Sequence, residues 1–522
     1  GAGGTAVDAA IATNAVLAVI MPNGCGLGGD AFWLIWDAKA ERHEALNGSG
    51  HAPVAADAAA WRRAGRTALP IRGPLSITVP GAVRSWAEAH RRHGRLRPDA
   101  ILAAAIDLAD GGFPAWPGYI EAVETTAVRF AASAELPDRG AAWASVHRPV
   151  DRPWRPGELV RQPALAGTLR RLADAGFDDL YDGALAERQA AGLAAAGSPI
   201  RVSDLRAAQA TWEQPIGTDY RGTRVTTHPP NSSGIVALEI LNVLARFDAP
   251  PASAFGPGGV ADPGWIHMGI EAAKLAMADR DSHLADPAAT DVPVDMLLSV
   301  EHARDLAGRI DRGAAARPAA TTSPVGGGTV YLAVVDSAGT AVSLIESNYK
   351  GFGSGVLDPA TGIGYHNRGS YFSLHEGHPN ELAPGKRPLH TLLPGMLFRR
   401  GRPWIIAGSM GGDAQPQIHA QVVSALVDGG VDIATAVAAP RWFVEAPEHY
   451  APPVEVRLEP RFAATVPAAL RALGHPVTEV APFDSLLGHC HAIELVDGGP
   501  AVDGGSLAAA TDPRSAGLPA VR

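Results

Sequence analysis

The sequence predicts an α+β fold in which helices pack on sheets. Apolar stretches of strand length lie near both ends of the chain, and long stretches with helical spacing fill the region between them. With 522 residues, the chain can form about three domains or one large layered domain, and both arrangements bury a large core. Charged residues make up 19% of the chain and hydrophobic residues 46%, which is typical of a globular protein rather than a disordered one.

The N-terminal part predicts a buried helix, a hairpin and a helical layer, in that order. Residues 6–21 are apolar on nearly every side, which indicates a helix enclosed by other elements. A glycine-rich turn at 23–29 precedes a strand at 31–37, and we expect its hairpin partner at 41–46. Residues 55–205 are rich in Ala and Arg, with helical spacing broken by Pro and Gly, and they predict a helical layer.

A second helical region and a linker occupy the middle of the chain. Helices are expected at 235–246 and 267–279, with a Pro/Ala/Gly loop at 249–264 between them. Residues 312–328 then have the composition of a linker and end in three glycines.

Strands dominate the region that follows the linker. Two strands are expected at 329–335 and 341–346, joined by a short polar turn. A third strand at 403–407 enters the glycine-rich turn 408–412, and a helix follows at 417–427.

Charge and apolar patterning restrict the partners of the chain. Lys and Arg total 44 against 54 Asp and Glu, a net charge of −10, so we expect no nucleic-acid partner. The longest apolar stretch, 9–21, is shorter than the roughly 20 residues that cross a bilayer, so we expect no membrane partner. No leader pattern is visible, but the chain opens without Met. We therefore expect a cytoplasmic protein and leave a periplasmic or secreted location open.

The two cysteines, Cys25 and Cys490, are too few for a disulfide framework, and a single bridge between them stays open. Cys490 lies between His489 and His491, a spacing that a strand also produces by placing every second residue on one face. No HExxH or CxxC motif accompanies these residues, so we expect no metal and no cofactor.

The junction of Gly328 and Thr329 offers a specific chemistry. A glycine-rich stretch before a strand is usually only a linker, but a Thr that opens a buried strand after Gly can attack its own upstream carbonyl. Cleavage would give Thr329 a free α-amine with an ordinary pKa of about 7.7–8.0. That amine can accept the proton of the Thr329 hydroxyl, so nucleophile and base would share one residue.

The turn Gly408–Gly412 (Gly-Ser-Met-Gly-Gly) allows two chemical interpretations beside that of a plain strand–helix turn. Its successive N–H groups can form an oxyanion hole at a helix N-terminus. It is also close to the nucleophile elbow of α/β-hydrolases, with Ser409 as nucleophile, Asp432 as acid and His475 or His489 as base.

The order of sequence motifs along the chain resembles that of the gamma-glutamyltranspeptidase family of N-terminal-nucleophile (Ntn) hydrolases. The motifs that carry the resemblance span essentially the whole chain. They lie at residues 3–10, 26–30, 79–81, 229–234, 271–274, 278–280, 329–336, 351–355, 384–389, 408–412 and 512–514.

The resemblance implies a four-layer αββα Ntn-hydrolase sandwich with additional helices. It implies self-cleavage between Gly328 and Thr329 into a large subunit (1–328) and a small subunit (329–522), which stay associated as one fold. A homodimer of such heterodimers stays open. By the same resemblance Thr329 is the catalytic nucleophile, Ser347 supplies a hydroxyl that bonds to it, and Gly411 and Gly412 form the oxyanion-hole pair.

The residues expected around the substrate depart from the family pattern. The family arginine that holds a glutamyl α-carboxylate is replaced by Ser49, and the acidic residue for the α-amino group by Tyr371. Loss of a bidentate clamp and its opposing carboxylate should remove most preference for a glutamyl head, while Arg368 offers a relocated carboxylate contact. The substrate-binding residues are expected to be Ser49, His51, Tyr349, Arg368, Tyr371, His390 and Thr391.

This combination favours the amidohydrolase branch of the family, which includes oxamate amidohydrolase-like members. We expect an N-terminal Thr that hydrolyses an amide-type bond of a small, non-glutamyl substrate, with water releasing the acyl-enzyme. Three alternatives stay open. They are a gamma-glutamyl hydrolase or transpeptidase acting on glutathione-like substrates, a hydrolase of carbon–carbon bonds in natural-product pathways, and an uncleaved homologue without activity.

Overall fold

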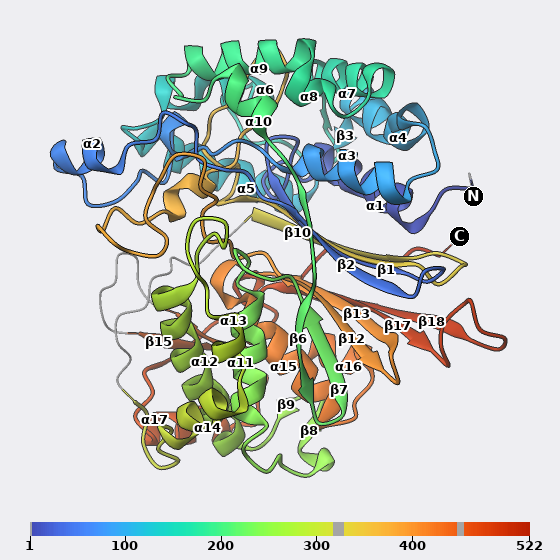
Figure 1. The fold of residues 1–522 in the computed structure, drawn as a ribbon, viewed down its shortest axis with the longest axis vertical. Helices are drawn as coiled ribbons and strands as arrows, with labels where there is room; N and C mark the ends of the chain where they lie inside the picture. The colour runs from blue at the N-terminus through green and yellow to red at the C-terminus, as the bar shows by residue number, and fades with distance from the viewer. Residues whose placement is uncertain (1–2, 317–327, 446–453, 522) are drawn as a thin grey trace.

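The computed structural model describes residues 3–316, 328–445 and 454–521, which stack as helices, a sheet, a second sheet and helices (Figure 1). This arrangement confirms the predicted α+β class and the four-layer αββα order. Helices α1–α10 cover the outer face of the first sheet, and α11–α17 cover that of the second (Figure 1). The helices are α1 Ala6–Ile20, α2 Ala58–Arg63, α3 Ala82–His93, α4 Pro98–Gly111, α5 Pro117–Ala132, α6 Ala141–His147, α7 Pro163–Ala175, α8 Asp179–Asp182, α9 Ala184–Ala195, α10 Val202–Ala207, α11 Gly234–Leu244, α12 Pro263–His283, α13 Val294–Leu297, α14 Val300–Gly308, α15 Gln415–Val427, α16 Ile433–Ala438 and α17 Thr465–Ala472.

Both large sheets are antiparallel. The first has the strand order β10-β11-β1-β2-β5 and the second β18-β17-β13-β12-β7-β6, while β14, β15 and β16 form a separate small sheet. The strands are β1 Asp30–Asp37, β2 Arg42–Gly48, β3 Phe113–Pro114, β4 Leu159–Val160, β5 Thr211–Glu213, β6 Ile216–Tyr220, β7 Thr223–Thr227, β8 Phe255–Gly256, β9 Gly259–Val260, β10 Gly328–Val335, β11 Ala341–Tyr349, β12 Pro394–Arg399, β13 Arg402–Met410, β14 Trp442–Glu445, β15 Glu455–Leu458, β16 Val477–Glu479, β17 His489–Val496 and β18 Ser506–Thr511.

The core is divided among the three interfaces between the layers. Along β1, Trp33 and Ile35 join the hydrophobic cluster under the first helical layer, whereas Leu34 joins a cluster with Met396 and Ile406 of the facing sheet. Successive side chains of a strand point to opposite faces of the sheet. Both faces of β1 are covered by other layers, and the strand is therefore apolar along most of its length. A third cluster fills the space between the second sheet and α11, α12 and α15.

The predicted elements occur close to their expected places. The helix expected at 6–21 is α1, whose start is set by a capping box in which the Thr5 hydroxyl accepts from the Asp8 backbone N–H. The strand expected at 341–346 runs on to Tyr349, which brings Ser347 into the sheet. The loop expected at 249–264 contains the hairpin of β8 and β9. Of the linker expected at 312–328, residues 317–327 lie outside the described residues, and Gly328 already belongs to β10.

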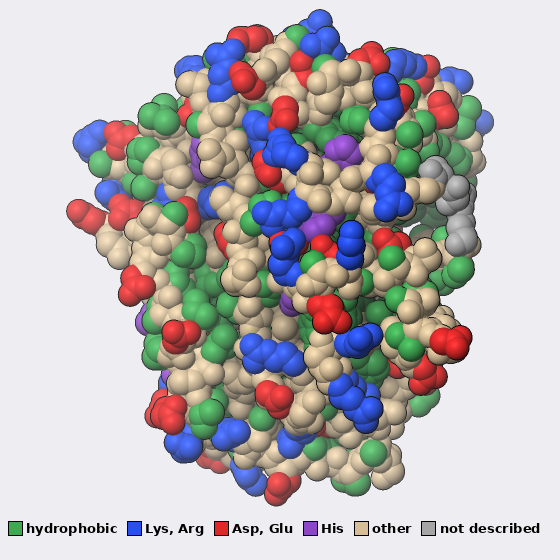
Figure 2. Space-filling model, turned by 45° about the vertical axis from the view of Figure 1, so that its right-hand side comes forward, with side chains coloured by type: hydrophobic (Ala, Val, Ile, Leu, Met, Phe, Trp, Pro, Cys, Tyr) green, Lys and Arg blue, Asp and Glu red, His purple; other side chains and the backbone are tan. Residues whose placement is uncertain are grey.

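The disulfide left open by the sequence is absent, because Cys25 and Cys490 are both free and buried. Cys25 belongs to the cluster under the first helical layer, and Cys490 belongs to the cluster beneath the second. Among the described residues, no helix combines the length and apolar character needed to cross a membrane. On the face in Figure 2, basic and acidic side chains are intermingled over the described surface.

The contact between the two sheets sets a strict size limit at Gly408. A Cβ on this residue of β13 would lie 2.1 Å from the ring of Tyr331 in β10. We predict that Gly408→Ala lowers the free energy of unfolding by about 1–3 kcal/mol, because the Tyr331 ring must shift in a packed interface. Chemical denaturation followed by circular dichroism measures this change.

The control is Gly167→Ala in α7, where a Cβ meets nothing within 4 Å. This exposed helical position should gain about 0.5–1 kcal/mol from the better helix former. Equal effects of the two substitutions would show that the β10–β13 contact is not tight.

Candidate active site

The junction of Gly328 and Thr329 lies at the first residues of β10, next to β11. Gly328 is opposite Tyr349 and Thr329 is opposite Ser347, so the register shifts between the two residues and leaves one residue of β11 unpaired. A Cβ on Gly328 would lie 1.9 Å from the carbonyl oxygen of Asn23, which explains why glycine is required there. Thr329 is only 5% exposed, so its hydroxyl lies in a largely water-free site.

Three hydrogen bonds converge on the hydroxyl of Ser347. Its Oγ lies 2.9 Å from Thr329 Oγ1, 2.6 Å from the Gly328 carbonyl oxygen and 2.7 Å from the Tyr349 backbone nitrogen. A serine hydroxyl has one hydrogen and two lone pairs. Because the carbonyl can only accept and the backbone N–H can only donate, Ser347 donates to Gly328 and accepts from Tyr349 and Thr329. The expected contact between Ser347 and Thr329 is therefore present.

The first three residues of the predicted glycine turn, Gly408–Met410, belong to β13, which is longer than expected, and Gly411 then leads into α15 through a short 3-10 helix, Gly412–Ala414. Gly411 and Gly412 have φ angles of 147° and 56°, in the left-handed region that favours glycine. Asp413 links this turn to the nucleophile region, because its Oδ1 accepts from the Tyr371 hydroxyl, and the Tyr371 ring lies 5.4 Å from that of Tyr349. The turn therefore lies next to the expected pocket, and its oxyanion role stays a prediction.

Arg368 is the central charge of the expected pocket. It is 1% exposed, its guanidinium lies 4.2 Å from the centre of the Tyr349 ring, and its Nη1 donates to Thr391 Oγ1 at 3.1 Å. Its Nε and Nη2 have no hydrogen-bond partner among the described residues. Burial lowers the pKa of Arg368, although Tyr349 and Asp30 oppose the shift. A buried guanidinium with two unused nitrogens is suited to binding an anion.

Tyr371 belongs to a second polar group that the sequence analysis did not foresee. Arg280 of α12 and Tyr371 both donate to Asp413, and Arg280 also donates to Asp281 at 2.6 and 2.8 Å. Burial raises the pKa of Tyr371, and Asp413 beside it acts in the same direction, so the phenol keeps its proton. In the sequence, only the positions of two of these residues indicated the group, because Arg280 is the last residue of one family motif and Asp413 directly follows another.

Asp30 links the segment of Ser49 to His390. Its Oδ1 accepts from the backbone of Gly50 at 3.0 Å, and its Oδ2 lies 3.3 Å from His390 Nε2. Burial alone would raise the pKa of Asp30, but the neighbouring His366, the hydrogen bond from His390 and the charge of Arg368 hold it below its usual value. Burial lowers the pKa of His390 to about 3, so this imidazole is neutral at physiological pH.

Ser49 and His51 have partners away from Thr329. The Ser49 hydroxyl donates to Asn47 Oδ1 at 2.7 Å and accepts from Asn231 at 3.1 Å. His51 Nδ1 lies 3.1 Å from the carbonyl oxygen of Ala52, within its own segment. Of the seven residues expected at the substrate, Tyr349, Arg368, Tyr371 and Thr391 form one connected group. His390 directly precedes Thr391 in the chain, whereas the side-chain hydrogen bonds of Ser49 and His51 lead to other residues.

The α/β-hydrolase alternative is wrong for this fold. Ser409 lies opposite Cys490, so the neighbouring His489 points to the other face of the sheet. Asp432 caps α16 by accepting from Thr435, and His475 contacts His267. The same alternation separates Cys490 from His489 and His491, so these three residues do not gather around one point.

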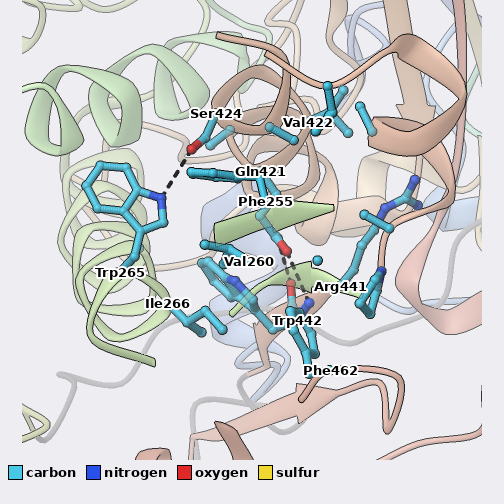
Figure 3. Close-up of a pocket in the computed structure, with 18 of the residues that line it drawn as sticks. Phe255, Val260, Trp265, Ile266, Gln421, Val422, Ser424, Arg441, Trp442 and Phe462 are labelled. Atoms are coloured by element: carbon cyan, nitrogen blue, oxygen red, sulfur yellow. Dashed lines mark hydrogen bonds between the residues drawn. The ribbon is translucent and has the colours of Figure 1, made fainter. Parts of the chain in front are cut away.

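A large apolar cavity lies elsewhere, inside the second helical layer (Figure 3). It encloses about 680 Å³ including its mouth and is lined by side chains of α11, α12 and α15 together with Trp442 and Phe462. None of the residues expected at the active site lines it. The cavity is therefore separate from the chemistry around Thr329.

Comparison with known proteins supports the resemblance stated above. A family model described as Gamma-glutamyltranspeptidase matches residues 1–521. The Oxamate amidohydrolase proenzyme of Klebsiella pneumoniae subsp. pneumoniae is 39% identical over 529 residues, covering 99% of this chain and 94% of that protein. The Glutathione hydrolase-like YwrD proenzyme of Bacillus subtilis is 37% identical over 522 residues and covers 99% and 94% of the two chains.

Among solved structures, the cephalosporin acylase from Bacillus halodurans is similar over nearly the whole fold. The TM-score is 0.87 at 36% identity, with 98% of this chain and 91% of that chain covered. The likeness confirms the expected sandwich, because it spans both sheets and both helical layers.

Proposed function

We propose a specific reaction for this chain, which belongs to the gamma-glutamyltranspeptidase family and has its Ntn-hydrolase fold. The protein cleaves its own peptide bond between Gly328 and Thr329, and Thr329 then hydrolyses the amide bond of a small substrate that carries a carboxylate. The observation that carries this proposal is the position of Ser347, whose hydroxyl bonds to both the attacking oxygen and the carbonyl under attack.

Self-cleavage begins with Thr329 Oγ1 attacking the carbonyl carbon of Gly328. As the O–C bond forms, the Thr329 hydroxyl proton passes to Ser347 Oγ, and the Ser347 proton passes to the former carbonyl oxygen. The C–N bond then breaks as the nitrogen of Thr329 takes that proton, which leaves an ester and a free α-amine. Water hydrolyses the ester, so the large subunit ends in the carboxylate of Gly328 and the small subunit begins at Thr329.

Substrate hydrolysis uses the same hydroxyl with the new α-amine as its base. An ordinary α-amine has a pKa of about 7.7–8.0, close to neutral pH, which suits proton transfer in both directions. The amine takes the Thr329 proton as Oγ1 attacks the substrate carbonyl, and it returns that proton to the leaving nitrogen. The N–H groups of Gly411 and Gly412 stabilise the oxyanion, and water then releases the acyl group.

Arg368 defines the substrate class. Its buried guanidinium has two nitrogens without partners among the described residues, next to Tyr349, whose N–H bonds to Ser347. A carboxylate that accepts from these nitrogens would lie beside Tyr349, which is linked through Ser347 to Thr329. A substrate that fits this arrangement is an amide with a carboxylate on or near its acyl carbon. The name of the Klebsiella pneumoniae relative identifies oxamate, an amide of this kind.

A glutamyl substrate would find fewer binding groups in this site. Ser49, which replaces the arginine expected in the family, is occupied by Asn47 and Asn231 and offers no bidentate clamp. Tyr371, in place of an acidic residue, donates its hydroxyl hydrogen bond to Asp413. Amide hydrolysis of a small anion is therefore the function that we favour.

The first test removes the hydroxyl of Ser347. We predict that Ser347→Ala slows self-cleavage about 100-fold, because the Gly328 carbonyl loses its donor and Thr329 its proton acceptor. Pulse expression followed by denaturing electrophoresis measures the conversion of the single chain to two.

The matched control is Ser343→Ala on the same strand, whose hydroxyl bonds to Tyr331 at 2.8 Å. This variant should process at the rate of the unaltered protein. Equal processing of the Ser347 variant and the unaltered protein would contradict the proton relay.

The second test compares oxamate with oxamide, its neutral isostere. We predict that Arg368→Gln lowers kcat/KM for oxamate by about 10- to 100-fold, since charge-assisted hydrogen bonds contribute about 1.5–3 kcal/mol. Oxamide should be affected little, and Arg368→Lys should recover part of the preference. Steady-state release of ammonia measures all rates, on protein shown by electrophoresis to be cleaved. Equal losses for both substrates would exclude a carboxylate contact.

A further inference from the structure

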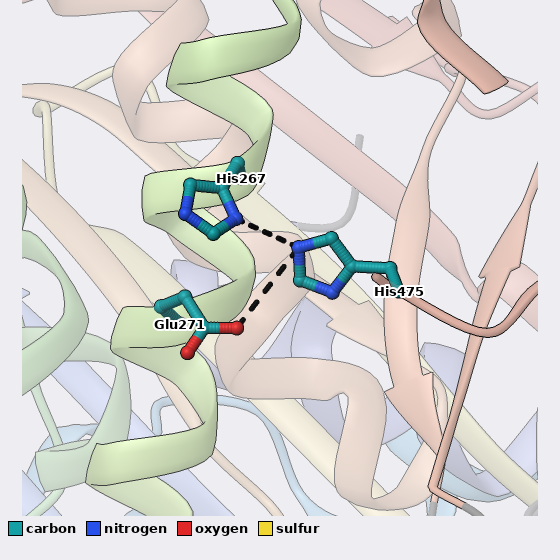
Figure 4. A group of neighbouring side chains, drawn as sticks. All are labelled: His267, Glu271 and His475. Atoms are coloured by element: carbon teal, nitrogen blue, oxygen red, sulfur yellow. Dashed lines mark hydrogen bonds and ion pairs between the residues drawn. The ribbon is translucent and has the colours of Figure 1, made fainter. Parts of the chain in front are cut away.

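In the part of the chain that the structure describes, two clusters of residues that commonly bind metals lie outside the active site, and their surroundings differ. In the first, His267 and Glu271 of α12 face His475, with His267 Nδ1 2.7 Å from His475 Nε2 (Figure 4). The carboxylate of Glu271 is already satisfied, because Lys274 donates to it at 2.6 Å and the backbone of Ala316 at 3.1 Å. An ammonium group thus neutralises this cluster, and it needs no added cation.

The second cluster joins three helices through Glu239 of α11, Asp279 of α12 and His302 of α14. His302 Nε2 lies 2.7 Å from Asp279 Oδ2 and 3.7 Å from Glu239 Oε1. Glu239 is 1% exposed, and neither of its carboxylate oxygens has a hydrogen-bond partner among the described residues. No lysine or arginine is paired with any of the three in the described part of the chain.

A buried carboxylate without a partner is costly, and a second carboxylate beside it increases the cost. A divalent cation removes both problems, because two carboxylates and one neutral imidazole balance its charge. The donor set also selects among cations, since Mg²⁺ and Ca²⁺ prefer oxygen ligands alone, whereas Zn²⁺ binds His nitrogen together with Asp and Glu oxygens.

We propose that Glu239, Asp279 and His302 form a binding site for one Zn²⁺ ion. Ligands about 2.0–2.2 Å from a tetrahedral zinc lie roughly 3.3–3.6 Å from one another. The distance of 3.7 Å between His302 and Glu239 is close to this range, and that of 2.7 Å between His302 and Asp279 needs to open by about 0.6 Å. The sequence did not indicate the site because its three residues lie far apart along the chain.

The bound ion would stabilise the part of α12 that supports the active site. Asp279 immediately precedes Arg280, which donates to Asp413 in the turn after Gly412 and lies next to Tyr371. By tying α12 to α11 and α14, zinc would hold Arg280 in place. Glu239, Asp279 and His302 are therefore positioning residues with respect to catalysis, and zinc takes no part in the reaction at Thr329.

The test is calorimetric titration of the full-length protein with ZnSO₄ after removal of metals with EDTA. We expect one site per chain and a higher melting temperature with zinc, but no such response to MgSO₄. Glu239→Gln and His302→Gln should each weaken binding at least about tenfold and abolish the rise in melting temperature. Circular dichroism checks that each variant is folded, and Glu239→Gln should fold well because Gln is close in size to the buried, unpartnered carboxyl group that it replaces.

The matched control is His475→Gln, which removes a histidine from the cluster in Figure 4. It should bind zinc like the unaltered protein. Failure of the unaltered protein to bind one equivalent, or undiminished binding by both Glu239→Gln and His302→Gln, would overturn the proposal. Loss of binding in His475→Gln alone would overturn it as well, by assigning the ion to the other cluster.

Discussion

The pairing of β10 with β11 at their shared end is the constraint on which the rest of the site depends. The register shift between Gly328 and Thr329 brings one serine hydroxyl within hydrogen-bond distance of both Thr329 Oγ1, the proposed nucleophile, and the carbonyl oxygen of Gly328. Only glycine fits at position 328, because the backbone of Asn23 lies against it. Without this register Thr329 would be an ordinary buried strand residue, and neither self-cleavage nor an N-terminal base would follow.

The sandwich holds this end of the sheet in place beside a group of buried polar side chains. β1 and β11 are covered on both faces, so their ends are fixed by apolar packing rather than by the polar groups themselves. Around that frame, Arg368 and Tyr371 come from one short 3-10 helix, whereas Asp413 comes from the turn after β13. Buried charges are tolerated when they are paired, and the two guanidinium nitrogens of Arg368 without partners among the described residues support a bound anion.

Local patterns predicted much of the fold. The buried helix at 6–21, the apolar run of β1 and the Gly-Thr junction were visible in the sequence because each depends on neighbouring residues. Family resemblance predicted the pair of Thr329 and Ser347. The sequence did not predict strand β12 or the full length of strand β17, because both depend on pairing with strands elsewhere in the chain. Nor did it predict the hydrogen bonds of Arg280 and Tyr371 to Asp413, which join residues far apart in the sequence.

The most direct test of the central claim is intact-mass spectrometry with N-terminal sequencing of the purified protein. The account predicts two associated chains, the smaller beginning at Thr329 and continuing with Val330 and Tyr331, and a single uncut chain when Thr329 is replaced by Ala. An uncut chain that hydrolyses amides, or a new N-terminus at any other residue, would contradict it.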